Sequence, residues 1–396
     1  MLAYADALEL LLRQRFAWGT ECVPLARAAG RVLARPVIAD RDFPPFDRVA
    51  MDGVAIDHRA SARGLRRFRV AGVQAAGEAP RRLPGDGACL EVMTGASLPL
   101  GASSVVRYER LSRAGAVVTV SGEVGEGSDV HPRGADARAG AELAAAGRCI
   151  GLAEVGLLAT CGYAEVEVRR RPRTAIVATG TELVPVGAAV ESHQIRSSNA
   201  VQLAYLLAGV SPASYLLADD RAVLRQRTGE LLAAHDLIVV SGGVSRGRYD
   251  FVAEVLAELG VERLFHGVAQ RPGKPLWVGR TATTLVVGLP GNPLAAVACA
   301  VAYLGPWLER QLGLDSSPRQ VRLAESVPAR GSLTLLQSVT LEERGGDAVV
   351  RPVRHGGSGD LASLVHATGL LVLPGERPGG YPVGEAFPYL PFEPLI

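Results

Sequence analysis

The feature that most limits the fold of this chain is a regular alternation of short apolar runs and helical stretches in its middle part. Strands that alternate with helices at this spacing predict a parallel, doubly wound α/β sheet in three layers. The apolar runs lie at residues 175–177, 215–217, 237–240, 264–265 and 284–287, and the helical stretches at 200–207, 221–234 and 251–259. We therefore expect an α/β domain in this region.

The predicted strands also resemble one another in how they end, since each is followed by small or polar residues. The ends of interest are Thr179 and Gly180, Asp219, Ser241 to Gly243, and Pro290 to Pro293. Ligands of open parallel sheets bind beyond the carboxyl ends of the strands. Glycines there let the backbone approach a ligand, and the following helix starts offer unpaired N–H groups to a phosphate or another oxyanion. One such loop is more simply explained as a turn, whereas several around one sheet favour a binding site.

Charged side chains lie in the same loops. Lys274 lies in a Pro-Gly-Lys-Pro turn, from which a flexible ammonium group could reach a phosphate. Glu182, Asp219 and Asp250 lie at strand-end loops or at a helix start, and carboxylates beside a phosphate commonly hold Mg²⁺. Asp220 and Asp250 suit the N-caps of helices equally well. Mg²⁺ is the cofactor that we expect.

The segments that flank the α/β region have other patterns. Residues 1–40 predict two helical stretches, one with an apolar stripe of Leu8, Leu11 and Leu12 and the other with Leu25, Ala28 and Val32. Residues 41–140 predict a mainly β module, because Gly and Pro separate short β-prone runs. A helix at 150–160, a strand at 164–168 and a basic linker at 169–173 follow, and residues 315–396 are β-prone again.

Length, charge and cysteine usage exclude several classes of protein. A chain of 396 residues predicts two to four domains, and a net charge of +2 argues against a nucleic-acid binder driven by bulk charge. The uncharged run at 281–308 contains Gly and Pro in its middle, which favours a buried strand, a turn and a buried helix over a membrane span. Five scattered cysteines without a C-x-x-C pair, and an acidic N-terminal helix without a signal-peptide pattern, predict a cytoplasmic protein with reduced thiols.

Several motifs extend over nearly the whole chain, and together they are far more specific than any one alone. They are Pro44-Pro45-Phe46-Asp47, Ala50-Met51-Asp52-Gly53, Met93-Thr94-Gly95-Ala96, Gly134-Ala135-Asp136, Thr179-Gly180-Thr181-Glu182-Leu183, Ile195-Arg196-Ser197-Ser198-Asn199, Ser241-Gly242-Gly243-Val244-Ser245, Pro272-Gly273-Lys274-Pro275, Gly288-Leu289-Pro290-Gly291-Asn292-Pro293, Gly357-Ser358-Gly359 and Gly369-Leu370-Leu371-Val372-Leu373-Pro374. In these motifs and their order the chain resembles the molybdopterin molybdenumtransferases, whose eukaryotic relatives include the gephyrin E domain.

The resemblance implies a multidomain α/β and β fold and an elongated homodimer. Its implied domains are a helical N-terminal domain from 1–40 with 141–170, an inserted β domain at 41–140, a molybdopterin-binding α/β domain at 171–314, and a C-terminal β-barrel at 315–396. The active cleft would lie between the α/β domain of one subunit and the inserted β domain of the other.

The resemblance also implies a reaction and a set of site residues. Adenylylated molybdopterin and molybdate would react with Mg²⁺ to give the molybdenum cofactor and AMP. The catalytic residues would be Asp52, Asp136, Glu182, Asp219, Asp250 and Lys274, of which Glu182, Asp219 and Asp250 would hold the metal. The substrate-binding residues would be Thr94, Thr179, Gly180, Ser198, Asn199, Ser241, Gly242, Gly243, Ser245, Arg271, Gly273, Pro290, Gly291, Asn292, Pro293 and Ser358. Further partners would be the upstream molybdopterin adenylyltransferase and acceptor molybdoenzymes, but no nucleic acid and no membrane.

Some polar positions depart from the family pattern and keep other readings open. Thr181 replaces an acidic residue, Arg271 replaces a lysine, and Arg246 and Arg248 replace an apolar and an acidic residue, which predicts a more basic cleft. His131 stands where an arginine is usual. The alternatives to an active molybdenumtransferase are a non-catalytic relative that carries or scaffolds a pterin, and an enzyme that uses tungstate.

Overall fold

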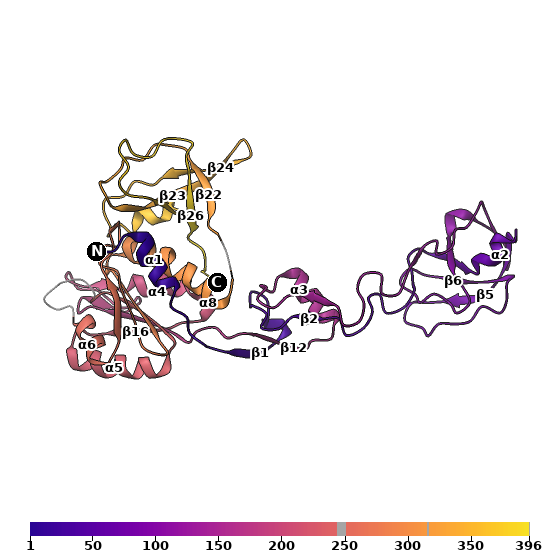
Figure 1. Cartoon of the computed structure of the whole chain (residues 1–396), viewed down its shortest axis with the longest axis horizontal. Coiled ribbons are helices and arrows are strands. Elements are labelled where there is room, and N and C mark those ends of the chain that lie inside the picture. Colours follow the sequence, from indigo (N-terminus) through magenta and orange to yellow (C-terminus); the bar gives the residue numbers. More distant parts are fainter. Residues whose placement is uncertain (244–250, 315–316, 396) are drawn as a thin grey trace. The chain divides into compact units, whose positions relative to one another are not determined.

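The computed structural model of the chain describes residues 1–243, 251–314 and 317–395, and the chain divides into two compact units. The first unit consists of Met1–Glu21 and Val168–Ile396, and the second of Cys22–Glu167. Figure 1 traces their helices and strands in colours that follow the sequence. The multidomain α/β and β fold that the sequence predicts is confirmed.

A six-stranded sheet forms the centre of the first unit. Its strands in spatial order are β16 (Ala213–Leu217), β13 (Thr174–Thr179), β17 (Leu237–Ser241), β21 (Leu285–Leu289), β20 (Trp277–Arg280) and β18 (Glu262–His266). The first four strands are parallel, whereas β20 is antiparallel to both of its neighbours. The prediction of a wholly parallel sheet is therefore wrong at this edge, because strands joined by a short loop, as β20 and β21 are, pair antiparallel.

Alternate residues of the sheet enter two different cores. In β17, Leu237 and Val239 belong to one core, and Ile238 and Val240 belong to the other. The helices of the first core are α1 (Tyr4–Leu12), α4 (Ser198–Leu206), α7 (Pro293–Cys299) and α8 (Gly305–Leu312), and those of the second are α5 (Arg221–Ala234) and α6 (Val252–Glu258). The predicted three-layer arrangement is confirmed (Figure 1), and burial of both faces explains why the strands are continuously apolar.

The uncharged run at 281–308 forms β21, a turn and a long buried helix, as predicted. This helix consists of α7, the π-helical turn η4 (Ala300–Leu304) and α8, which follow one another without a break. Every side chain of η4 is buried. Within the part of the chain that the structure describes, no helix is both long and apolar enough to cross a membrane.

Of the two predicted N-terminal helices, the structure contains only the first. Helix α1 buries Ala7 and Leu11 in the α/β core of the first unit, so it does not join residues 141–170 as we expected. The second predicted helix is wrong, because this segment forms β1 (Thr20–Pro24), which pairs with β12 (Glu165–Arg169), and then a single 3-10 turn at Leu25–Arg27. Pro24 and Gly30, the latter with a φ of 72°, interrupt a longer helix. The other domain boundaries remain predictions.

Five strands at the C-terminal end of the first unit close into a barrel. They are β22 (Arg319–Leu323), β23 (Thr334–Arg344), β24 (Asp347–Pro352), β25 (Gly369–Leu373) and β26 (Ala386–Pro391), and the pairing of β23 with β25 closes the ring. Its core contains Leu335, Val339, Val350 and Phe387. A short strand from the α/β part, β19 (Gln270–Arg271), pairs in parallel with the start of β23. This pairing attaches the loop that contains Lys274 to the barrel.

The second unit is mainly β, as predicted for residues 41–140. Its largest sheet has the order β7 (Ser104–Arg107), β4 (Gly53–Ile56), β6 (Ala88–Val92), β5 (Arg67–Gln74), β9 (Val117–Val120) and β8 (Leu111–Ala114). Smaller pairs are β3 (Arg48–Val49) with β10 (Val130–His131) and β2 (Val37–Ile38) with β11 (Glu142–Ala144). Two helices, α2 (His58–Ala62) and α3 (Leu152–Thr160), complete the unit.

Candidate functional site

A cavity of about 500 Å³ lies at the carboxyl ends of the parallel strands of the first unit. We call it the strand-end cavity. The residues predicted from the sequence that line it are Thr179, Gly180, Glu182, Ser198, Asn199, Asp219, Ser241, Gly242, Gly243, Gly291, Asn292 and Pro293. The fold thus gathers five segments that are separate in the sequence around one space.

Asn199 ties three of these segments together. Its Nδ2 donates hydrogen bonds to Ser241 Oγ at 2.9 Å and to the Gly291 carbonyl at 2.7 Å. Its Oδ1 is buried without a hydrogen-bond partner among the described residues. Since a buried acceptor without a donor is costly, this oxygen suits a ligand that brings an N–H group.

Two carboxylates, Glu182 and Asp219, line the strand-end cavity. Asp219 Oδ1 accepts a hydrogen bond from the hydroxyl of Thr179. Mg²⁺ usually binds one or two carboxylates and completes its shell with waters and phosphate oxygens, so this pair fits such an ion. Among the described residues, no group of three or more His, Cys, Asp or Glu side chains could hold a metal. The third predicted ligand, Asp250, lies outside the described residues.

Glycine at position 242 allows two strand ends to approach each other closely. Gly242 has a φ of 96°, and a Cβ placed there would stand 2.4 Å from the Thr179 carbonyl oxygen. A side chain is therefore excluded by both the backbone conformation and the backbone of β13. The neighbouring Gly243 is also left-handed, with a φ of 64°.

Replacing Gly242 by alanine is expected to lower the free energy of unfolding by about 1–3 kcal/mol and to distort the strand-end cavity, because the end of β13 must move. Thermal denaturation measures the loss of stability. Gly187→Ala is the matched control, since a Cβ at Gly187 meets no atom within 4 Å. Equal melting temperatures for the two variants would contradict the expected clash.

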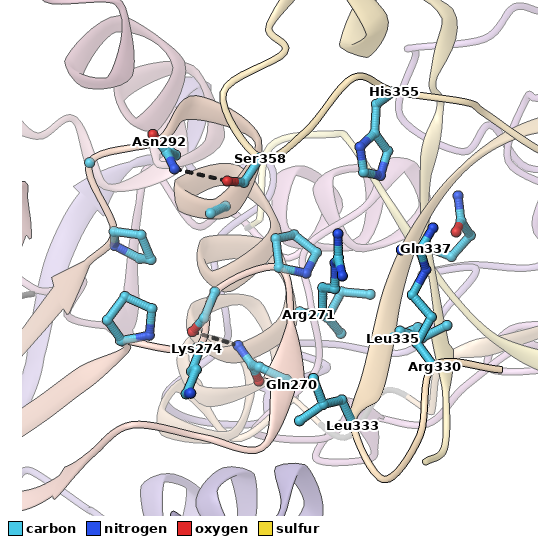
Figure 2. A pocket seen from close by; sticks show the side chains of 17 residues that line it. Gln270, Arg271, Lys274, Asn292, Arg330, Leu333, Leu335, Gln337, His355 and Ser358 are labelled. Atoms are coloured by element: carbon cyan, nitrogen blue, oxygen red, sulfur yellow. Dashed lines mark hydrogen bonds between the residues drawn. The ribbon is translucent and has the colours of Figure 1, made fainter. Parts of the chain in front are cut away.

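A second cavity, of about 540 Å³, lies between loops of the α/β part and the barrel of the first unit. It is lined by Arg271, Lys274, Arg330 and His355, and we call it the cationic cavity. No Asp or Glu is among its lining residues in the described chain, and none of Arg271, Lys274 and Arg330 forms an ion pair there with a described carboxylate. Figure 2 shows these side chains around the cavity. The arrangement suits an oxyanion.

Lys274 has a particular place in the composition of the chain. It is the only lysine in the sequence, and all the other residues that are counted as lysine or arginine are arginines. Lysine presents a compact ammonium on a flexible stem and arginine a planar fork, so the two are not interchangeable at an oxyanion site. The backbone carbonyl of Lys274 accepts a hydrogen bond of 2.9 Å from the Val268 N–H, which fixes the base of the side chain.

The two cavities meet at Asn292, which together with Gly291 lines both of them. Asn292 is the N-cap residue of α7, and its Nδ2 donates a hydrogen bond of 2.8 Å to Ser358 Oγ, drawn as a dashed line in Figure 2. Ser358 follows the barrel strand β24 in the sequence. A ligand that extends past Asn292 would therefore contact both cavities.

In the second unit, two predicted catalytic carboxylates have polar partners. Thr94 donates to Asp52 Oδ1 from its backbone N–H and from its hydroxyl, both at 2.7 Å. These bonds, the N–H first, lower the pKa of Asp52 below its usual value and keep it ionised. Asp136 Oδ1 lies 2.9 Å from His131 Nε2.

Most of the predicted site residues of the first unit lie in one of the two cavities. Arg271, Gly273, Lys274, Pro290 and Ser358 line the cationic cavity. Ser245, and the basic substitutions Arg246 and Arg248, lie outside the described residues. Asp220, which we left open between a cap and a ligand, is the N-cap of α5 and accepts from the Val223 N–H.

Sequence reasoning missed several lining residues. Those of the cationic cavity are Gln270, Arg330, Gln337 and His355, and one of the strand-end cavity is Arg196. Arg196 lies inside a motif that carried the resemblance, so its signal was present. Arg330, Gln337 and His355 come from the barrel, where no strand-end rule applies.

Comparisons with known proteins agree along the whole chain. Family models match for the MoeA N-terminal region (domain I and II) at residues 2–162, a probable molybdopterin binding domain at 175–310, and the MoeA C-terminal region (domain IV) at 320–392. A molybdopterin molybdenumtransferase of Synechocystis sp. is 33% identical over 400 residues, with 98% of this chain and 99% of that protein covered. One of Staphylococcus aureus is 29% identical, with 94% and 92% covered. The crystal structure of a molybdopterin biosynthesis MoeA protein from Pyrococcus horikoshii matches with a TM-score of 0.84 at 28% identity, with 99% of both chains covered.

Proposed function

Because the chain belongs to the molybdopterin molybdenumtransferase family of molybdenum cofactor biosynthesis, we propose that it transfers molybdenum from molybdate to adenylylated molybdopterin and releases AMP in a Mg²⁺-dependent reaction. The observation that carries this proposal is that two cavities suited to different anions meet at Gly291 and Asn292. A transfer between two anionic substrates needs such neighbouring sites, because binding must overcome their mutual repulsion.

The strand-end cavity suits adenylylated molybdopterin. The unpartnered Oδ1 of Asn199 would accept an N–H of the pterin ring, and the glycine loops at Gly180 and Gly242 offer backbone to the phosphates. Thr179 would hold Asp219 in place through its hydroxyl. The cationic cavity suits molybdate, since Arg271, Lys274 and Arg330 can donate charge-assisted hydrogen bonds to its oxygens.

Glu182 and Asp219, with Asp250 as a third ligand, would hold Mg²⁺. When bound, the ion would neutralise charge on the phosphoanhydride that is cleaved. Hydrolysis of this bond joins the oxygen of a water to one phosphorus and breaks the bridging P–O bond, so that AMP leaves. The carboxylates of the chain would orient that water.

We further propose that the protein acts as a homodimer in which Asp52 and Asp136 complete the site. Asp52 is ionised and oriented by Thr94, which suits a carboxylate that positions a substrate or a proton. Asp136 is paired with His131.

Replacing Asp52 by asparagine is expected to lower the rate of AMP release about tenfold, because the amide keeps the shape of the carboxylate but its hydrogen bonds are no longer charge-assisted. Initial rates with adenylylated molybdopterin, molybdate and Mg²⁺ measure this effect. Asp86→Asn, which changes an exposed carboxylate of the same unit, serves as the control. An unchanged rate in Asp52→Asn would remove this residue from the mechanism.

The proposed function as a whole is tested by incubating the protein with adenylylated molybdopterin and Mg²⁺, with and without molybdate, and measuring AMP by chromatography. We expect AMP to form only when molybdate is present. Tight binding of the pterin without molybdate-dependent AMP would refute the transferase reaction and support the pterin carrier. A strong preference for tungstate over molybdate would instead correct the metal donor.

A further inference from the structure

A buried polar network lies beneath the loop that carries Arg271 and Lys274. It consists of Gln270, Cys299 and Tyr303, whose exposed fractions are 1%, 0% and 0%. Gln270 belongs to β19, Cys299 is the last residue of α7, and Tyr303 lies in the π-helical turn η4. Most core positions nearby are apolar, so three neighbouring polar side chains at this depth need an explanation.

The hydrogen bonds of the network use the whole amide of Gln270. Its Oε1 accepts from the hydroxyl of Tyr303, and its Nε2 donates to the Gly273 carbonyl at 3.1 Å and to Cys299 Sγ at 3.4 Å. Burial raises the pKa of Cys299 to about 12 and raises that of Tyr303 as well, so both remain protonated donors. No donor of Gln270 is left for solvent or for a ligand.

Gly273, the acceptor of this network, lies in the middle of the loop. It has a φ of 91°, and a Cβ placed there would stand 2.2 Å from Cys299 Sγ and 2.8 Å from Gln270 Nε2. The loop backbone is thus pressed directly onto the network. Arg271 and Lys274 flank this point on either side and line the cationic cavity. Figure 2 shows Gln270 beside Lys274, with its bond to the Gly273 carbonyl dashed.

Two further contacts hold the network and the start of its loop in place. The backbone of Gln270 and Arg271 pairs with Thr334 and Leu335 of the barrel, and the ring of Tyr303 packs edge-on against Tyr4 of α1 at 5.4 Å. A π-helical turn shifts the register of a helix by one residue and is frequent near functional sites. Here that turn contains the hydroxyl that orients Gln270.

We propose that Gln270 and Tyr303 are positioning residues for oxyanion binding: the Tyr303–Gln270–Gly273 chain of hydrogen bonds fixes the loop so that Arg271 and Lys274 face one bound oxyanion. This inference rests on the proposed function in taking molybdate as that oxyanion. Gln270 and Tyr303 lie on the buried side of the loop and affect oxyanion binding only through its conformation. Its loss should therefore weaken oxyanion binding more than pterin binding.

The test compares Tyr303→Phe with Thr284→Val in the full-length protein. Tyr303→Phe removes one hydroxyl and leaves Gln270 Oε1 without its donor. Thr284→Val also removes a buried hydroxyl, one bonded to the His235 carbonyl at 2.9 Å, at the opposite end of β21 from the cavities. Calorimetry measures the Kd for molybdate, steady-state kinetics measure the KM for each substrate, and thermal denaturation measures stability.

We expect Tyr303→Phe to raise the Kd and the KM for molybdate about fivefold, with the KM for adenylylated molybdopterin within about twofold of wild type. Gln270→Met should act in the same direction, and Thr284→Val should lower the melting temperature without changing the Kd. An unchanged Kd in Tyr303→Phe, or an equal rise in Thr284→Val, would overturn the positioning role.

Hydrogen exchange keeps this inference separate from the proposed function. The Val268 N–H donates to the Lys274 carbonyl at 2.9 Å and the Leu276 N–H to the Gly273 carbonyl at 3.2 Å, so both amides report how firmly the loop is held. Tyr303→Phe should speed their exchange and Thr284→Val should not. If the wild type binds no molybdate but exchange is faster in Tyr303→Phe alone, the assignment of the oxyanion fails and the role of the network in holding the loop stands. If exchange is the same in the two variants, the role of the network fails.

Discussion

Replacing Lys274 by methionine is expected to reduce molybdate-dependent AMP release about tenfold to a hundredfold. This range corresponds to the free energy of one charge-assisted hydrogen bond to the transferred group. Methionine keeps most of the apolar stem of the side chain and lacks the ammonium group. The reaction is followed at several molybdate concentrations, and most of the effect should be a higher half-saturating concentration. This follows because none of the three cations of the cationic cavity is neutralised by a described carboxylate.

Two variants bracket this result. Lys274→Arg restores the charge with a different geometry and should recover part of the affinity. Arg227→Met removes a cation from the exposed face of α5, where it pairs with Glu230 one turn away, and should leave the reaction unchanged. If Lys274→Met kept the molybdate dependence of the wild type, the cationic cavity would not be the molybdate site.

Replacing Asp236 by alanine is expected to lower the free energy of unfolding by about 3 kcal/mol. Asp236 is 5% exposed and accepts from Arg170 Nη1 at 2.8 Å, from the Arg173 N–H at 2.8 Å and from Arg173 Nη2 at 3.1 Å. Its removal leaves the partly buried guanidinium of Arg170 without this partner. This loss of stability lies at the lower end of the range for removing one partner of a buried ion pair, because Arg173 is largely exposed. Urea denaturation measures it.

The contribution of Asp236 should also depend on pH. Burial alone would raise its pKa, but the hydrogen bonds from Arg170 and Arg173 outweigh burial and hold the pKa at about 2. An unfolded aspartate has a pKa of about 3.9, so the stabilisation is complete above that pH and is lost as the pH falls towards 2. The difference in stability between wild type and Asp236→Ala should therefore narrow from pH 7 to pH 3. A constant difference would contradict the assigned ion pair.

The strand-end cavity was predictable from the sequence because its residues follow a rule of chain geometry. Parallel strands bring their carboxyl ends to one edge, so Thr179, Asp219 and Ser241 had to be neighbours once the sheet was recognised. Lys274 was predicted from a different pattern, a Pro-Gly-Lys-Pro turn that presents a flexible ammonium group. The assignment of roles to these residues remains a prediction.

Other features could not be predicted, because they depend on contacts between distant segments that no local pattern encodes. Arg330 and His355 lie in barrel loops that read as ordinary turns, and only the pairing of β19 with β23 brings them to Lys274. Residues 169–173 were predicted only as a basic linker, yet Arg170 and Arg173 bind Asp236, which immediately precedes β17. Gln270 and Tyr303 gave no signal, since a buried polar pair is recognised only after the core is known.

The single lysine of the chain has a consequence for how the protein can be handled. Lys274 in the cationic cavity carries the only side-chain primary amine of the sequence, so acylating reagents, amine-directed cross-linkers and amine-coupled sensor surfaces react either there or at the terminal α-amino group. Immobilisation through Lys274 would block the cationic cavity. Conversely, the extent of acetylation at one position, measured by mass spectrometry with and without molybdate, would report directly the fraction of cavities that are occupied.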